Sequence, residues 1–308
     1  MTPIFFWVEE YLFCPKKLSQ KILSYLLLPF TALYCVVVIT KRVFSTPKDF
    51  GLPIISIGNL TVGGNGKTPF TLALLKDKKN AAVILRGYKR KSSDLLEVNP
   101  DTPVHTCGDE ALLYAKSLPN SLVIVSKNRT KAIEYAKEKG IKAIFLDDAF
   151  HKSDIKKFDI LLKPSNEPAN SFCLPSGAYR EPKSLYKKAD IVAVEEKDFK
   201  REVFIKNPTS KMVLVTAIAK PERLDKYLPK DGSVIAKEYF KDHHFFTKEE
   251  LQAIMQKYNA TSLLVTTKDK VKIENFGLKL SIMELEVKIE RKIVQKIDDF
   301  IDNFANVG

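Results

Sequence analysis

The part of this sequence best suited to chemistry is a glycine cluster followed by a lysine and a threonine. It comes directly after the apolar, β-branched run of residues 54–58, and Pro69, which a helix tolerates in its first turn, follows it. This order predicts a strand, a loop and a helix, in which backbone N–H groups and the helix N-terminus can surround a phosphate group. We therefore expect a phosphate-binding loop made of Thr61, Val62, Gly63, Gly64, Asn65, Gly66, Lys67 and Thr68.

Lys67 and Thr68 have separate expected roles in this loop. A lysine here reaches the β- and γ-phosphates of a nucleotide, and a threonine hydroxyl at the next position suits Mg²⁺. The strict pattern, G-x-x-x-x-G-K-[ST], fails only at its first position, which is Thr61. The alternative is a glycine-rich surface turn with an unrelated lysine. The predicted strand before the loop and the helix after it favour the phosphate site.

Two adjacent carboxylates provide a candidate metal site. The apolar run from Ile141 to Leu146 predicts a buried strand that leads into Asp147 and Asp148. An aspartate at the tip of a strand, downstream of a phosphate loop, is the usual holder of Mg²⁺ in such proteins, directly or through water. We therefore expect Thr68 and the aspartate pair to be metal ligands, with a plain strand-end turn as the alternative. Either aspartate fits the role.

A carboxylate and an imidazole are candidates for a general base. Asp109 lies at the start of a helix expected from Ala111 to Ser117, and His243 lies in a loop between a predicted strand and a predicted helix. A base within hydrogen-bond reach of an acceptor hydroxyl helps phosphoryl transfer because an alcohol is scarcely ionised at neutral pH. The alternatives are an ordinary helix cap for Asp109 and a solvated loop histidine for His243. A metal site is disfavoured because His243 and His244 are adjacent and lack spaced partners.

The N-terminal region contains a long uncharged segment. Residues 22–40 carry no charge, and Lys21 and Lys41 flank them. This length just reaches the roughly 20 residues that a helix needs to span a bilayer. Pro29 and several polar side chains leave three alternatives, namely a single span, a helix in the membrane interface and a buried core helix. We favour membrane attachment of some kind, as a span or in the interface, over a buried helix. The basic residues at both ends would suit a membrane surface with anionic lipids.

Composition limits the class of protein. The chain has 308 residues, 45% of them hydrophobic, so it can bury a large core. The formal net charge of +13 indicates an anionic partner, which could be nucleic acid, an acidic membrane or a phosphorylated substrate. The four cysteines lie far apart without metal-binding spacing, which favours reduced thiols in the cytosol.

Alternation of strands and helices predicts an α/β fold, a parallel sheet sandwich like that of P-loop NTPases. We expect three parts: an N-terminal membrane-associated helical segment (1–45), a nucleotide-binding core domain (46–205) and a smaller C-terminal α/β domain (206–308). The expected strands are 81–85, 122–125, 141–146, 158–162, 189–194, 212–217, 234–236, 262–266 and 281–287, and the expected helices are 69–75, 111–117, 129–139, 221–227, 247–257 and 290–303.

Several motifs resemble those of the tetraacyldisaccharide 4'-kinases, the lipid A kinases of Gram-negative bacteria. The loop from Asn59 to Pro69 is similar to the phosphate loop of that family, which also has threonine at the first position. The likeness covers most of the chain and includes Arg86-Gly87-Tyr88, Gly108-Asp109-Glu110, Asp147-Asp148-Ala149-Phe150, Leu174 to Pro182, Pro221-Glu222-Arg223, Asp242-His243 and Thr267-Lys268-Asp269. The chain departs from the family at Asn65, where threonine is usual, and at Ala149-Phe150-His151-Lys152, where Gly-Phe-Gln-His is usual.

The resemblance implies an activity and a location. The activity is ATP-dependent phosphorylation of the 4'-hydroxyl of a tetraacylated glucosamine disaccharide 1-phosphate, with Mg²⁺, at the cytoplasmic face of the bacterial inner membrane. It implies that Asp109 and His243 act as a pair. Lys67 would hold β- and γ-phosphate oxygens, and Arg129 or Arg180 would meet the developing charge or the substrate phosphate. No obligate protein partner is expected.

Two other classes of function are weighed against a kinase. The first is a membrane-associated P-loop switch or transport ATPase that binds a protein partner. A guanine-specific switch would show [NT]-K-x-D, whereas residues 267–270 read Thr-Lys-Asp-Lys and place the aspartate one position early. The second is a nucleic-acid binder, which we rank last because the lysine-rich stretches lack interleaved aromatic residues.

Overall fold

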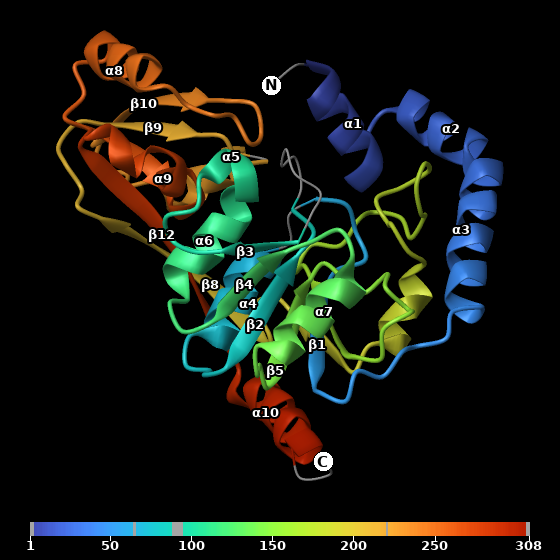
Figure 1. Ribbon diagram of the computed structural model, residues 1–308. Helices are drawn as coiled ribbons and strands as arrows, with labels where there is room; N and C mark the ends of the chain where they lie inside the picture. Colours follow the sequence, from blue (N-terminus) through green and yellow to red (C-terminus); the bar gives the residue numbers. More distant parts are fainter. Residues whose placement is uncertain (1–2, 64–65, 88–94, 220, 306–308) are drawn as a thin grey trace.

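The computed structural model describes residues 3–63, 66–87, 95–219 and 221–305. Gly64 and Asn65 of the expected phosphate loop, and Tyr88 of the Arg-Gly-Tyr motif, lie outside the described residues. In that part of the chain the strands form two sheets, one of seven strands and one of five (Figure 1). The fold is therefore a mixed α/β fold dominated by parallel sheets, as the alternation of elements predicts.

The seven-stranded sheet carries the candidate phosphate loop. Its order is β3-β4-β2-β5-β1-β6-β7, and neighbours pair in parallel except for β3 with β4. The central strands are short apolar runs that are buried on both faces, as parallel strands covered by helices must be. The strands are β1 (Ile54–Gly58), β2 (Ala81–Leu85), β3 (Leu96–Val98), β4 (Leu122–Val125), β5 (Ala143–Asp147), β6 (Phe158–Lys163) and β7 (Ile191–Val194).

Helices cover both faces of this sheet and bury two separate apolar clusters. One cluster joins the strands to α4 (Lys67–Leu75), α6 (Asp109–Ser117) and the C-terminal α10 (Arg291–Ala305). The other joins them to α7 (Arg129–Glu138). The short α5 (Val104–Cys107) leads into α6. The carboxyl ends of β1 and β5 and the N-termini of α4 and α6 therefore meet at one edge, where ligands bind in open α/β sheets.

The five-stranded sheet has the order β10-β9-β11-β12-β8, with only β8 antiparallel to its neighbour. Strand β8 was not expected from the sequence, and the predicted domain boundary at 205/206 would separate it from β12, its partner. That boundary stays a prediction. The elements of this part are β8 (Phe199–Lys206), β9 (Met212–Thr216), β10 (Val234–Tyr239), β11 (Ser262–Thr266), β12 (Leu280–Ile289), α8 (Lys248–Lys257), α9 (Thr267–Ile273) and the 3-10 helices η1 (Lys183–Lys188), η2 (Pro221–Tyr227) and η3 (Glu274–Phe276).

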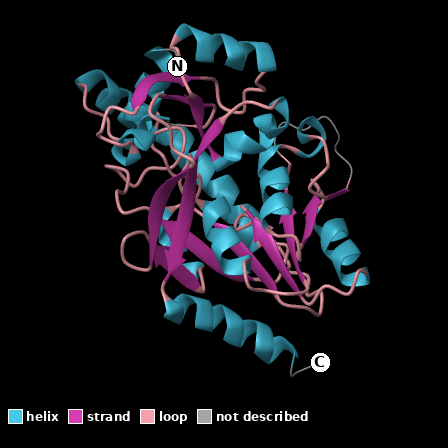
Figure 2. Ribbon diagram, turned by 90° about the vertical axis from the view of Figure 1, so that its left-hand side faces the viewer, coloured by secondary structure: helices cyan, strands magenta, loops and turns pink. Residues whose placement is uncertain are grey.

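Helix α10 returns from the second sheet to the first. Ile293 and Ile297 of α10 are buried in the same cluster as Phe70 of α4, and the rest of α10 extends from the base of the molecule (Figure 2). Aromatic contact between Phe158 and Phe300, with ring centroids 4.7 Å apart, also fastens α10 to the first sheet. The C-terminal end of the chain thus ties the two sheets together.

The uncharged N-terminal segment folds as two helices instead of one. Helices α2 (Leu18–Leu26) and α3 (Leu28–Val43) follow α1 (Pro3–Phe13) and run along the side of the core away from the second sheet (Figure 1). A bend of 50° separates α2 from α3, next to Pro29, which cannot donate a backbone hydrogen bond. By length and apolar composition no single helix in the described residues could cross a bilayer, whereas this bent pair has the length and composition to do so.

Candidate active site

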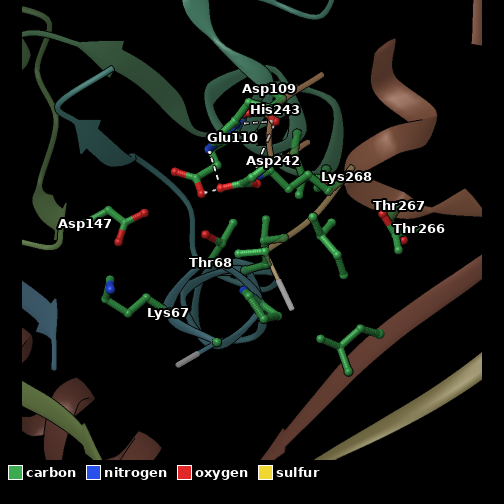
Figure 3. Close-up of a pocket in the computed structure, with 18 of the residues that line it drawn as sticks. Lys67, Thr68, Asp109, Glu110, Asp147, Asp242, His243, Thr266, Thr267 and Lys268 are labelled. Atoms are coloured by element: carbon green, nitrogen blue, oxygen red, sulfur yellow. Dashed lines mark hydrogen bonds and ion pairs between the residues drawn. The ribbon is translucent and has the colours of Figure 1, made fainter. Parts of the chain in front are cut away.

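A cavity of about 800 Å³ lies between the two sheets, at the edge where α4 and α6 begin. The first sheet contributes the phosphate loop, Asp109 and the aspartate pair to its lining. The second sheet contributes His243, Lys268 and side chains of β8 and β12. Figure 3 shows Lys67 and Thr68 at the start of α4, around the same space as Asp109, Asp147 and His243. Segments far apart in the sequence therefore form one chemical site.

The described part of the phosphate loop has the geometry that a phosphate cradle needs. Gly66 caps α4 with a φ of 76°, a left-handed conformation that glycine adopts without strain. The Lys67 ammonium donates to Asn59 Oδ1 at 2.9 Å and lies 3.5 Å from Asp148 Oδ1. Backbone N–H of Val62 donates to Ala178 O at 2.8 Å, which holds the loop against the segment that carries Arg180.

Asn59 organises two cations beside the loop. Its Nδ2 donates to Thr61 O at 2.7 Å, and its Oδ1 accepts from both Lys67 and Arg180 Nη2, the latter at 2.6 Å. The side chain is buried, so each of these bonds is made in a site with little water. Asn59 begins the loop that resembles the family's phosphate loop, but the sequence analysis assigned it no role, although a polar residue directly after the buried strand β1 is a signal for one.

Asp148 is already neutralised by the protein. Arg180 donates to its two carboxylate oxygens, each at 3.0 Å, in a fork geometry. Burial raises the pKa of Asp148, but the hydrogen bonds from Arg180 and the charge of Lys67 outweigh it and hold the pKa well below its ordinary value. Arg180 thus faces the aspartate pair, where the sequence predicted a contact with developing charge or substrate phosphate.

Asp147 is in the opposite electrostatic state. It is buried, its Oδ2 accepts only a long bond of 3.3 Å from Tyr114 Oη, and its Oδ1 has no hydrogen-bond partner among the described residues. Burial, and next the negative charge of Glu110, raise the pKa of Asp147 to about 7, although Lys67 acts against the rise. A buried carboxylate that lacks a partner is a position where a divalent cation would relieve the cost of burial.

Arg129 lies behind the aspartate pair. It is buried, and its guanidinium donates to the backbone oxygens of Ser126 at 2.7 Å and Asp147 at 3.1 Å. Burial lowers its pKa to about 10, so the group stays charged at neutral pH. Through these bonds Arg129 supports the backbone at the tip of β5. A direct contact between Arg129 and the substrate stays a prediction.

The structure brings Asp109 and His243 together from the two sheets. His243 Nδ1 lies 3.0 and 2.8 Å from the two carboxylate oxygens of Asp109, and Figure 3 shows the pair at the cavity wall. His243 adopts a φ of 62°, which is uncommon for a non-glycine residue and is often found at functional sites. Both side chains are largely buried, with 8% of Asp109 and 15% of His243 exposed. The contact spans 134 residues of sequence, which spacing alone cannot reveal.

Nearby charges keep the Asp109 carboxylate ionised. Burial alone would raise its pKa, but the hydrogen bond with His243 and the positive charge of Lys268, whose Nζ lies 3.6 Å away, lower it to about 2. Lys268 also lies 3.4 Å from Glu110, and His243 Nε2 lies 3.5 Å from Asp242 Oδ2. Lys268 and Asp242 appear in motifs singled out in the sequence, but no role was assigned to them there.

A metal site made by protein alone is absent from the described residues, because no three His, Cys, Asp or Glu side chains there are grouped to hold an ion. Mg²⁺ commonly takes one or two protein ligands and fills its shell with nucleotide oxygens and water. Asp147 fits such a role because its buried Oδ1 lacks a partner, and Thr68 lines the same cavity.

Known proteins similar to this chain agree with the resemblance inferred from its motifs. A family model described as tetraacyldisaccharide-1-P 4'-kinase matches residues 23–305. The chain is 51% identical to the tetraacyldisaccharide 4'-kinase of Aliarcobacter butzleri, with 98% of both chains covered, and 44% identical to that of Helicobacter acinonychis, with 97% of this chain and 96% of the relative covered. The tetraacyldisaccharide 4'-kinase of Campylobacter jejuni is 45% identical, with 97% of this chain and 96% of the relative covered.

A solved structure shares the fold. It is the crystal structure of an "apo" form of LpxK from Aquifex aeolicus in complex with ATP, which is 28% identical and superimposes with a TM-score of 0.76. The match covers 92% of this chain and 99% of that one. The resemblance is confirmed, and the chain belongs to the tetraacyldisaccharide-1-P 4'-kinase family.

Proposed function

We propose that this protein transfers the γ-phosphate of ATP to the 4'-hydroxyl of a tetraacyldisaccharide 1-phosphate, a step of lipid A biosynthesis. The observation that carries the proposal is the single cavity in which a phosphate loop faces the Asp109–His243 pair. A kinase needs both parts, because one holds the phosphate donor and the other receives the proton of the acceptor. Membership of the family and the ATP complex of the LpxK structure from Aquifex aeolicus support the choice of donor and acceptor.

The donor site works mainly by position and charge. Lys67 would leave its contact with Asn59, or share it, to hold β- and γ-phosphate oxygens, and the N-terminus of α4 adds partial positive charge. Arg180 stays on Asp148 and keeps that carboxylate neutralised beside the phosphates. In phosphoryl transfer such alignment supplies most of the catalysis, because the protein takes little part in bond making.

Mg²⁺ is proposed as the metal that accompanies ATP, held by Asp147 and the Thr68 hydroxyl. When bound, it would neutralise charge on the transferring phosphate. The partnerless buried oxygen of Asp147 supports this assignment over Asp148, whose two oxygens are occupied by Arg180.

The acceptor side is proposed to use Asp109 and His243 as one unit. With a pKa near 2, the Asp109 carboxylate is ionised at neutral pH and can share an incoming proton with the imidazole that it touches. Lys268 stabilises the ionised carboxylate and would lose part of that role as the proton arrives. The hydroxyl proton thus has an acceptor at the moment when its oxygen attacks phosphorus.

Attachment to the cytoplasmic face of the bacterial inner membrane is proposed for the N-terminal helices. One side of α3 binds the protein through Thr31, which donates to Ser176 Oγ, Tyr34, which donates to Arg180 O, and Arg42, which pairs with Glu181 at 2.7 Å. Other large apolar side chains of α2 and α3 are exposed, as expected of a surface that enters lipid. They are Leu18, Ile22, Tyr25, Leu26, Phe30, Leu33, Val36, Val37, Ile39 and Val43.

A transfer assay tests the proposed function. Purified protein with ATP labelled in the γ-phosphate is offered a panel of acceptors, including tetraacyldisaccharide 1-phosphate in mixed micelles. We expect label in the lipid and in no unacylated sugar. Hydrolysis of ATP without labelled lipid would contradict the proposal and favour a nucleotide switch.

A further inference from the structure

Arg201 brings a cation from the second sheet to the phosphate loop. It lies on β8 and lines the same cavity as Gly66 and Lys67. A Cβ atom on Gly66 would come within 3.0 Å of both the Arg201 Cζ and its Nη2. The glycine at this position therefore allows two elements from different sheets to approach closely, in addition to adopting a positive φ.

This approach gathers positive charge around one point. Gly66 is the cap of α4, so the partial positive charge of the helix N-terminus points to the place where the guanidinium lies. Lys67 follows Gly66, and Arg223 of η2 lines the same cavity. Burial, and next the charge of Arg201, lower the pKa of the Arg223 guanidinium, whereas the charges of Glu9 and Glu195 raise it.

Glu195 balances only part of this charge. Its carboxylate lies 3.0 Å from Arg201 Nε and 3.2 Å from Nη2, and 15% of Arg201 and 14% of Glu195 are exposed. Such a pair fixes the direction of the guanidinium. Carboxylates also act on the neighbouring cations, because Asp148 lies 3.5 Å from the Lys67 ammonium and the charges of Glu9 and Glu195 raise the pKa of Arg223. A phosphate group at the N-terminus of α4 would add charge-assisted contacts with the guanidinium that Glu195 has oriented.

We propose that Arg201 is a ligand of the β- or γ-phosphate of the bound nucleotide, supplied by the second sheet and aimed by Glu195. The inference rests on the proposed function in that the nucleotide is ATP. The planar fork of a guanidinium suits phosphate oxygens, and the contact would add a second cation to the one that Lys67 supplies. ATP binding would then join the two sheets through its phosphates.

Nucleotide affinity without lipid tests the assignment. Binding of ATP, ADP and AMP with Mg²⁺ is measured by calorimetry for the wild type and for Arg201→Gln. We expect ATP to bind about 10- to 100-fold more weakly to the variant, because a charge-assisted contact in a largely buried site is lost. AMP, which lacks both phosphates concerned, should bind within about threefold of its wild-type affinity. Unchanged ATP affinity, or an equal loss for AMP, would overturn the proposal.

Two further variants serve as a matched control and as an alternative to Arg201→Gln. Lys200→Gln removes the same charge from the adjacent, exposed residue of β8, which points to the other face of the sheet, and should leave ATP affinity unchanged. If Arg201→Gln is unstable, ATP affinity is measured in the same way for Arg201→Lys, which keeps a positive charge beside Glu195. We expect it to bind ATP several-fold more weakly, and wild-type affinity would overturn the proposal. Wild-type protein that binds ATP but phosphorylates no lipid would count against the proposed function and leave this comparison intact.

Discussion

Replacing Asp147 with asparagine should stabilise the protein while abolishing its activity. The carboxylate is buried at the tip of β5, and one of its oxygens has no partner among the described residues. An amide of the same shape keeps the contact with Tyr114 and carries no charge. The neutral amide would also escape repulsion by the negative charges of Glu110 and Asp148, which help to raise the pKa of Asp147. Sites that store electrostatic cost for function commonly gain stability when the cost is removed.

The size and sign of the effect follow from the pKa of Asp147. Its folded-state pKa is about 7, compared with an ordinary value of 3.8. Because the pKa is raised, the folded state loses stability as the pH rises from about 4 to about 7. Above about pH 7 the full cost of the ionised, buried carboxylate is present. Three units at about 1.4 kcal/mol each set an upper bound of about 4 kcal/mol. We expect Asp147→Asn to recover about 1 to 3 kcal/mol at pH 8, because a buried amide also has a cost.

Thermal unfolding in a metal chelator measures this effect. At about pH 8 the variant should have a Tm several degrees above wild type, and the difference should disappear at about pH 4. Asp148→Asn is the matched control, because it removes a carboxylate that Arg180 already neutralises, and its Tm should fall. A Tm for Asp147→Asn equal to or below that of wild type at pH 8, or a gain that does not depend on pH, would refute this reasoning.

Three other outcomes are expected. Lys67→Ala should weaken ATP binding and lower kcat together, because the proposed role of its ammonium is to hold phosphate in both ground and transition states. Calorimetry and a transfer assay measure the two effects, and unchanged turnover would show that the lysine does not bind the nucleotide. Asp109→Ala and His243→Ala should each lower kcat by about 10²-fold or more while ATP affinity is retained. The loss of kcat in the double variant should be far smaller than the product of the two single losses. A loss equal to that product would show that the two residues act separately. Val37→Glu, on the exposed side of α3, should reduce binding to vesicles without changing ATP affinity. Ile235→Glu changes another exposed apolar residue, outside α3, and should leave vesicle binding unchanged. Equal vesicle binding by the wild type and both variants would argue against a membrane role for α3.

Local pattern was enough to place most strands of the first sheet, although the short edge strand β3 was not expected. The strands at 81–85 and 122–125 have the bounds that the sequence predicts, because each is an uninterrupted apolar run buried on both faces. Strand β8 was missed because its residues, Phe-Lys-Arg-Glu-Val-Phe-Ile-Lys, contain three consecutive charged residues and show neither a continuous apolar run nor strict alternation. The segment is ordered as a strand through its pairing with β12. The break between α2 and α3 shows how Pro29 can divide a segment that apolar length alone presents as one helix.

The chemistry of the site was partly predictable for a similar reason. Lys67, Thr68 and the aspartate pair belong to short motifs whose structural context is local. Asp109 and His243 were named from their residue types, but their contact depends on how the second sheet meets the first. Asn59 begins the phosphate-loop motif but had no role assigned from the sequence, and Arg201 belongs to none of the motifs. The importance of both residues follows from the partners that the fold brings to them.

The most direct test of the central claim is where the transferred phosphate goes. Wild-type protein is incubated with ATP, Mg²⁺ and tetraacyldisaccharide 1-phosphate in micelles, and the product is characterised by phosphorus NMR and mass spectrometry. A 4'-deoxy acceptor provides the control. We expect one added phosphate on the 4'-oxygen, with the 1-phosphate intact and no transfer to the 4'-deoxy lipid. Phosphate on another position, or turnover of ATP with no phosphorylated lipid, would contradict the account.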